Sequence, residues 1–130
     1  MEIKFRFRLK LIIDNWGTYK KGDVDTFFIS LLDEKSGLVR FGIDKQWEVI
    51  SCDTFTGKED SQIDGNEVYE NDIIENCDTK LLQVVYWNEN EASWYCRYVG
   101  DESRIVSLSD SLGNLNTVVG NIFDNPNLLQ

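Results

Sequence analysis

Carboxylates are the side chains of this sequence whose type and spacing could do chemistry. Glu67, Glu70, Asp72 and Glu75 lie close together along the chain. Two carboxyl groups held at a fixed separation can hydrolyse a glycoside, provided that one of them is desolvated and carries the proton that it donates. Nothing in the sequence indicates that either group is buried. A hydrolase built on these residues is therefore the least favoured of the hypotheses below.

The same acidic stretch begins like a calcium-binding loop. Asp60, Gln62, Asp64 and Gly65 fall at the first, third, fifth and sixth positions of an EF-hand template. The template fails at its twelfth position, where Asn71 replaces the bidentate Glu, and no helix is indicated on either side. The sequence therefore predicts a solvated acidic turn in which Gly65 supplies a positive φ angle.

Histidine is absent from the chain. Its absence excludes Ser-His-Asp hydrolysis, Cys-His proteolysis and histidine-ligated zinc. No glycine cluster precedes a lysine and a helix, so a phosphate-binding loop is unsupported as well. We predict no catalytic residue, no metal ligand and no cofactor, and we expect a protein that is not an enzyme.

Length and composition indicate a globular protein. The chain has 130 residues, of which 42% are hydrophobic, a composition that supports one core. It lacks an apolar run of about 18 residues and starts with alternating charged and apolar side chains, so we expect no membrane segment and a cytoplasmic location. Cys52, Cys77 and Cys96 are odd in number and widely spaced; we interpret them as reduced thiols that act as small buried hydrophobes.

The charge distribution bears on partners. The formal net charge is −10, which disfavours binding to phosphate backbones without regard to sequence. Residues 3–11 alternate, however, with apolar side chains on one face and Lys4, Arg6, Arg8 and Lys10 on the other, as in a half-buried strand. This basic stripe could contact an anionic partner, or it could pair with acidic strands of the same protein or of a second copy. We favour the second interpretation.

Short strand patterns follow one another along the rest of the chain. Residues 14–25 are expected to form a loop, and residues 26–32 could form a helix or a strand, with the strand preferred. The further predicted strands are residues 38–43, 47–51, 68–76, 81–87, 93–99, 104–108 and 117–123. Turn-forming residues separate them, which is typical of a small barrel or sandwich.

Aromatic side chains gather on two of these predicted strands. They are Tyr86, Trp87, Trp94, Tyr95 and Tyr98. Such residues could stack nucleic-acid bases, as in an OB-fold, but more often they belong to a core or to the rim of a protein-binding groove. Core is the favoured interpretation, and Trp87 and Trp94 remain candidate partner contacts.

Four motifs, taken in order, resemble the YopX family of phage and prophage proteins. They are FTG at residues 55–57, DGNEVYENDII at 64–74, VVYW at 84–87 and VVGNIFDNPNLL at 118–129. The resemblance runs from about Trp47 onward. In this chain the loop after Gly57 is longer than the usual form, and Asn71 replaces a turn glycine; because asparagine tolerates left-handed backbone, a turn at Asn71 is predicted. The structural motif residues are Gly57, Gly65, Tyr69, Asn71, Asp72, Gly120, Asn121 and Pro126.

The resemblance implies a mostly β protein with little helix, of phage or prophage origin, in the bacterial cytoplasm. We expect an N-terminal β subdomain at residues 1–52 and a small SH3-type barrel at residues 53–130. The resemblance implies no reaction. The favoured hypothesis is a noncatalytic protein-binding or assembly module that binds itself as a homo-oligomer, or a host or phage protein. The alternatives are a nucleic-acid accessory protein that uses the basic stripe and an acidic inhibitor of a host enzyme.

Overall fold

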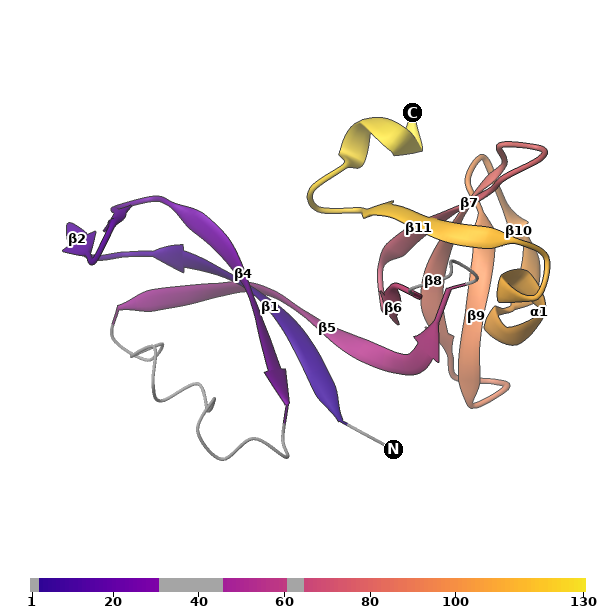
Figure 1. Cartoon of the computed structure of the whole chain (residues 1–130), viewed down its shortest axis with the longest axis horizontal. Coiled ribbons are helices and arrows are strands. Elements are labelled where there is room, and N and C mark those ends of the chain that lie inside the picture. The colour runs from indigo at the N-terminus through magenta and orange to yellow at the C-terminus, as the bar shows by residue number, and fades with distance from the viewer. Residues whose placement is uncertain (1–2, 31–45, 61–64) are drawn as a thin grey trace. The chain divides into compact units, whose positions relative to one another are not determined.

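The structure, a computed structural model, describes residues 3–30, 46–60 and 65–130. It is mostly β, as predicted, and its two larger sheets are antiparallel (Figure 1). The chain divides into two compact units, which we call the N-terminal unit, Met1–Phe55, and the C-terminal unit, Thr56–Gln130. The boundary falls within one long strand, β5 (Trp47–Glu59).

In the N-terminal unit the central strand is β1 (Lys4–Leu11). It pairs on one side with β4 (Val24–Ser30) and on the other with β5, both antiparallel. The alternating pattern at residues 3–11 correctly predicted β1. For the segment that could have been helix or strand, the preferred strand is confirmed up to Ser30, where β4 ends. The predicted strand at residues 38–43 lies outside the described residues.

A small hairpin occupies part of the segment that the sequence assigned to a loop. Strands β2 (Asn15–Trp16) and β3 (Tyr19–Lys20) pair with each other. Gly17 turns the chain between them with φ 61°, a left-handed conformation that costs glycine little. Two-residue strands are too short to show a period, which explains why the sequence did not reveal them.

The apolar face of this sheet carries an aromatic cluster. Leu9, Leu11 and Trp47 are almost completely buried, and partly buried side chains pack around them: Phe7, Ile13, Trp16, Tyr19 and Phe27. Trp47 meets Trp16 edge to face with ring centroids 5.6 Å apart. Such pairs contribute about 0.5–1.5 kcal/mol beyond their buried area, so this cluster is the core of the N-terminal unit.

Strand β5 is longer than predicted. The sequence indicated a strand at residues 47–51 and a turn at residues 55–57, whereas the strand continues to Glu59. Gly57 has a left-handed φ of 84°, but the strand continues through it. Thr56 helps to hold this part of the chain, because its hydroxyl donates a hydrogen bond of 2.7 Å to the carbonyl of Val68.

The C-terminal unit is built on a five-stranded antiparallel sheet in the order β10, β9, β8, β7, β11. The strands are β7 (Asp72–Asn76), β8 (Leu82–Asn88), β9 (Ser93–Tyr98), β10 (Asp101–Ser107) and β11 (Asn116–Asn121). Strand β6 (Glu67–Tyr69) precedes them, and the short 3-10 helix η2 (Pro126–Leu129) ends the chain. Strands β8, β9, β10 and β11 had been predicted to within a few residues, whereas the single strand predicted at residues 68–76 is divided into β6 and β7.

One helix departs from the prediction. Residues 108–112 were assigned to a strand end and a turn, but they form α1 (Leu108–Leu112). The hydroxyl of Ser107 caps it by accepting a hydrogen bond from the backbone N–H of Asp110. Leu108 and Leu112, one turn apart, are buried in the core with Val68, Ile74, Val85 and Cys96. Burial of these two leucines outweighs the turn propensity of the sequence.

The described strands do not close into a barrel. The expected SH3-type barrel is therefore not confirmed; the described residues form two larger antiparallel sheets, the small β2–β3 hairpin and little helix. In the described part of the chain, no helix has the length and apolar character to span a membrane.

Candidate functional site

Two of the four cations in the basic stripe on β1 form ion pairs within the chain. Asp53 on β5 lies opposite Arg6, and its Oδ2 atom accepts hydrogen bonds from Nε and Nη2 of Arg6 at 3.0 and 2.8 Å. Nη1 of Arg8 lies 2.8 Å from the same oxygen and 3.0 Å from the hydroxyl of Ser51. Arg6, Arg8 and Asp53 are only 7, 3 and 1% exposed. These two arginines thus take part in a buried ion-pair group of the same protein.

The outer members of the stripe are more accessible. Lys10 is exposed, and the ammonium of Lys4 lies 5.4 Å from the centre of the Phe55 ring. A nucleic-acid surface built on all four cations would need Arg6 and Arg8 to leave Asp53, which burial of the group opposes. The two lysines are the members that a partner can reach.

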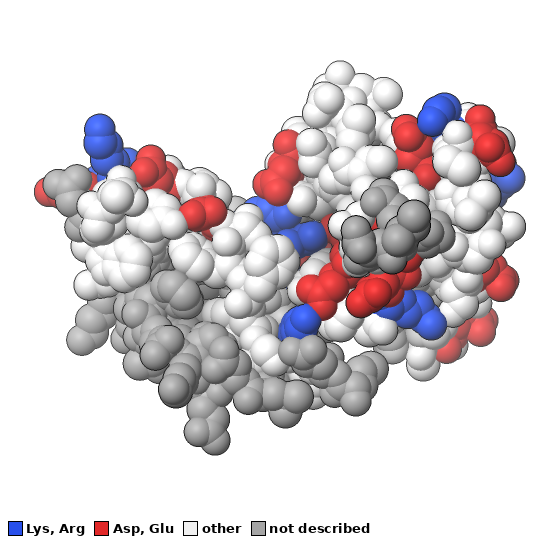
Figure 2. Space-filling view, viewed as in Figure 1, with Lys and Arg blue, Asp and Glu red and all other residues white. Residues whose placement is uncertain are grey.

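The negative charge of the protein belongs to one of its units. The C-terminal unit has 14 acidic and four basic residues, which gives it a formal charge of −10, whereas the N-terminal unit has nine of each. Figure 2 shows acidic side chains spread over the face of the C-terminal unit in view. A field of this kind attracts cationic partners and repels anionic ones.

The two tryptophans kept as candidate contacts lie side by side. Trp87 on β8 is paired in register with Trp94 on β9, and their rings meet edge to face at 5.2 Å. Trp94 packs against the core of the C-terminal unit, while Trp87 is 44% exposed. The prediction of core therefore holds for Trp94, and Trp87 presents much of its indole to solvent.

The predicted carboxylate group does not assemble around a reaction centre. Asp72 is 1% exposed, and its Oδ2 atom accepts a hydrogen bond of 2.8 Å from the backbone N–H of Tyr69, so it stabilises the turn between β6 and β7. Glu67 accepts a bond from the hydroxyl of Tyr69 at 3.3 Å. Among the described residues, no three acidic, cysteine or histidine side chains are placed to hold a metal ion.

Asp60, the first residue of the calcium-loop pattern, is buried and was wrongly expected to be solvated. Its carboxylate accepts hydrogen bonds from the backbone N–H and the side-chain amide of Asn66, and from the backbone N–H of Val118 on β11. It thereby joins the end of β5 to β11. The second and third residues of the pattern, Gln62 and Asp64, lie outside the described residues.

The turn residues of the central motif behave as predicted. Asn71 has φ 69° and Gly65 has φ 39°, both in the left-handed region. The backbone N–H of Asn71 donates to the carbonyl of Val85 on β8, and its own carbonyl accepts from the N–H of Ile122, the residue that follows β11.

The last motif forms a network of side-chain to backbone bonds. The side-chain oxygen of Asn121 accepts from the backbone N–H groups of Phe123 and Asp124, and that of Asn125 accepts from the N–H of Asn121. A Cβ atom on Gly120 would overlap the Asn125 side chain, which explains the glycine. Pro126 starts η2, so these motif residues shape the chain end.

The cysteines divide into two kinds. Cys96 is completely buried in the core, as predicted, whereas Cys52 and Cys77 are exposed, so that prediction is wrong for these two. All three are thiols. Burial raises the pKa of the Cys96 thiol to about 12, which keeps it protonated and unreactive near neutral pH.

The sequence did not predict one cluster of buried polar side chains in the C-terminal unit. Gln83, Ser111 and Asn116 are buried, at 4, 1 and 3% exposure, and they line a cavity of about 370 Å³ in the C-terminal unit. The available signal was Gln83, a polar residue inside the apolar run at residues 81–87. Ser111 could not be linked to it, because the helix that carries Ser111 was not predicted.

Fold and surface together define a small β protein of two antiparallel units, one electrically balanced and one strongly acidic. The sequence model of the YopX protein matches residues 14–130, and the chain belongs to the YopX family. The match starts well before Trp47, where the resemblance had been expected to begin. A search of curated proteins finds no match.

Proposed function

We propose that this chain is a noncatalytic protein-binding module whose contact surface centres on Trp87. The observation that carries the proposal is the pairing of an exposed indole with one anchored in the core: Trp87 is 44% exposed, and its ring rests on that of Trp94. Tryptophan is among the residues that most often dominate a protein interface, because it buries much surface at little cost in conformational entropy.

The surroundings of Trp87 are held in place before any partner binds. The side-chain oxygen of Asn88 accepts hydrogen bonds from the backbone N–H groups of Asn90 and Glu91, at 3.0 and 3.2 Å. These bonds shape the loop that joins β8 to β9. A preorganised loop loses little entropy on association, which favours binding at this end of the hairpin.

Charge indicates the kind of partner. Glu89 and Glu91 are exposed in the loop next to Trp87, and the whole unit is acidic. A basic polypeptide that offers an apolar side chain to the indole suits this surface. A second copy of the C-terminal unit would bring like charges together, so self-association through Trp87 is disfavoured. We retain a phage origin and a bacterial cytoplasmic setting as part of the proposal.

The test is selection from a random peptide library displayed against the full chain. The proposal expects the selected peptides to be rich in lysine and arginine around one apolar residue. The matched control is Ile105→Ala, which removes an apolar side chain that is 46% exposed elsewhere on the same unit. Acidic peptides, or peptides retained equally by Trp87→Ala, would overturn the proposal.

The nucleic-acid alternative has less support from the geometry. Two of its four cations are engaged with Asp53; of the other two, Lys10 is exposed and Lys4 is half-buried beside Phe55. It predicts a salt-dependent shift of labelled DNA that is lost in the Lys4→Gln and Lys10→Gln double variant and unaffected by Trp87→Ala.

A further inference from the structure

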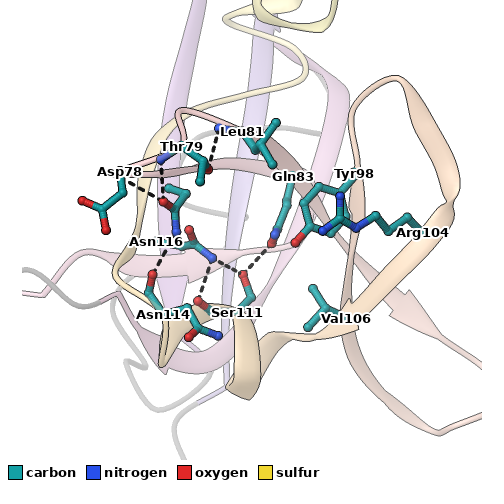
Figure 3. A pocket seen from close by; sticks show the side chains of 11 residues that line it. Asp78, Thr79, Leu81, Gln83, Tyr98, Arg104, Val106, Ser111, Asn114 and Asn116 are labelled. Atoms are coloured by element: carbon teal, nitrogen blue, oxygen red, sulfur yellow. Dashed lines mark hydrogen bonds between the residues drawn. The ribbon is translucent and has the colours of Figure 1, made fainter.

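A polar cavity in the C-terminal unit is not used by the proposed protein-binding surface. Its volume of about 370 Å³ lies in the range of small-molecule sites, about 300–1,000 Å³. Its walls come from the turn after β7, the start of β8, the paired strands β9 and β10, and the segment from α1 to β11 (Figure 3). Most of the lining side chains are amides, hydroxyls or charged groups.

Buried hydrogen bonds orient the amide of Gln83 in this cavity. Nδ2 of Asn116 lies 2.9 Å from Oγ of Ser111, and that hydroxyl lies 2.5 Å from Oε1 of Gln83. The hydroxyl accepts a bond from Asn116 Nδ2 and donates to Gln83 Oε1. The amide nitrogen, Nε2, is therefore the remaining group of a side chain that is only 4% exposed.

This nitrogen is an available donor. No hydrogen bond joins Gln83 Nε2 to any described residue, whereas its oxygen is satisfied by Ser111. Since Gln83 lines the cavity wall, a bound molecule can accept from Nε2. The nitrogen is not fully withdrawn from solvent, so a bound acceptor would take the place of water there.

Arg104 supplies a second donor and the positive charge. Its guanidinium lies 4.1 Å from the centre of the Tyr98 ring, and both residues line the cavity. Figure 3 shows Arg104 extending from β10 toward Tyr98 and Gln83. Within the described part of the chain Arg104 forms no ion pair, although it lies in a unit with 14 acidic residues.

We propose that this cavity binds a carboxylate group, which Arg104 holds through its planar guanidinium and Gln83 through Nε2. The guanidinium and the Nε2 group both donate hydrogen bonds, so a ligand group that accepts them is complementary. A carboxylate matches the guanidinium fork. A phosphate dianion is disfavoured, because Asp78 also lines the cavity and the unit is strongly acidic.

The carboxylate can come from a free small acid or from the C-terminus of a polypeptide. The site is distinct from Trp87, although Gln83 and Trp87 lie on the same face of β8, four residues or about 13 Å apart. Binding in the cavity therefore does not depend on the proposed function, and each can fail without the other.

The test is an NMR titration of the full chain that follows the side-chain amide of Gln83 and the guanidinium of Arg104. The probes are acetate, a short neutral peptide with a free C-terminus, the same peptide with a C-terminal amide, and inorganic phosphate. The proposal expects acetate or the free-acid peptide to shift both signals. Tighter binding of acetate would identify a small-acid site, and tighter binding of the peptide a C-terminus site.

Arg104→Gln should weaken binding of the carboxylate probe about tenfold or more, as expected for loss of a charged hydrogen bond. Arg97→Gln is the matched control, because Arg97 also lies over a tyrosine ring, that of Tyr86 at 5.5 Å, but does not line this cavity. Trp87→Ala should leave binding unchanged. Equal binding of the amidated peptide, tighter binding of phosphate, or equal losses in Arg104→Gln and Arg97→Gln would overturn the proposal.

Discussion

Arg6 and Asp53 face each other across β1 and β5, with Nη2 of the arginine 2.8 Å from Oδ2 of the aspartate. The carboxylate is 1% exposed, and Arg8 reaches the same oxygen. A buried ion pair adds little compared with an apolar replacement, but removal of one partner leaves a charge in a poorly solvated place. Loss of one partner should therefore lower the stability of the N-terminal unit by more than the intact ion pair adds to it.

Asp53→Asn should destabilise the N-terminal unit strongly. The change removes the negative charge between two buried arginines, and we expect the free energy of unfolding to fall by about 3 kcal/mol or more. Urea unfolding followed by the NMR signals of Trp16 and Trp47 measures this. The control is Glu48→Gln. Glu48 is an exposed acid on β5, the strand of Asp53, and it lies opposite Lys10 of β1; its replacement should lower the free energy of unfolding by less than about 0.5 kcal/mol. Equal effects of the two variants would contradict the account.

Cys96 should make the free energy of unfolding fall as the pH rises through the alkaline range. Its thiol has a pKa of about 12 in the fold against 9.0 ordinarily, so the unfolded chain loses this proton first. Its contribution is intact below about pH 9 and is lost as the pH rises toward about 12, at up to about 1.4 kcal/mol per pH unit. Urea unfolding at several pH values should show a shallower decline for Cys96→Ala than for the wild type.

The exposed cysteines serve as the comparison for Cys96. Cys52→Ala and Cys77→Ala should keep the wild-type slope, since both thiols are exposed. A thiol-reactive disulfide reagent should modify two thiols of the folded chain quickly and the third only on unfolding. Rapid modification of all three would show that Cys96 is not protected.

Asn71 should be replaceable by glycine but not by alanine. Its φ of 69° costs other L-residues about 1–2 kcal/mol. Asn71→Gly should therefore stay within about 0.5 kcal/mol of the wild type, and Asn71→Ala should lose about 1 kcal/mol in thermal unfolding. Identical melting temperatures for the two variants would show that the turn relaxes without strain.

Gly120 and Asn125 should be energetically coupled. A methyl group on Gly120 would overlap the Asn125 side chain, so Gly120→Ala should destabilise the C-terminal unit. The loss should be smaller in an Asn125→Ala background, with a coupling energy of about 1 kcal/mol. A double-mutant cycle by chemical denaturation measures it. Additive losses would mean that the close approach carries no strain.

Local patterns predicted most strands, since alternation and turn residues act over a few positions. The strand at residues 3–11 is the clearest case. Helix α1 was missed because its five residues are too short for a helical period, and its stability comes from burial of Leu108 and Leu112. The extension of β5 through Gly57 was missed because a glycine in a TG pair is ordinarily a turn signal.

Relationships between distant residues were beyond the reach of local patterns. That Arg6 and Arg8 would find an acidic partner in the chain was the favoured interpretation, but Asp53 could not be chosen without the register of β1 and β5, which shifts between Arg8 and Leu9. Gln83 and Ser111 meet only once α1 is placed beside β8. The site at Trp87 could be predicted from the sequence, because its pairing with Trp94 follows from one short hairpin.

The affinity of the selected basic peptides for Trp87→Ala tests the central claim most directly. Trp87→Ala should remain folded, since loss of the cross-strand contact with Trp94 costs about 1 kcal/mol or less. Calorimetric titration should show binding weakened about thirtyfold in Trp87→Ala, the effect of a hot-spot residue worth about 2 kcal/mol, and little changed in Ile105→Ala. Unchanged affinity in a folded Trp87→Ala variant would contradict the account.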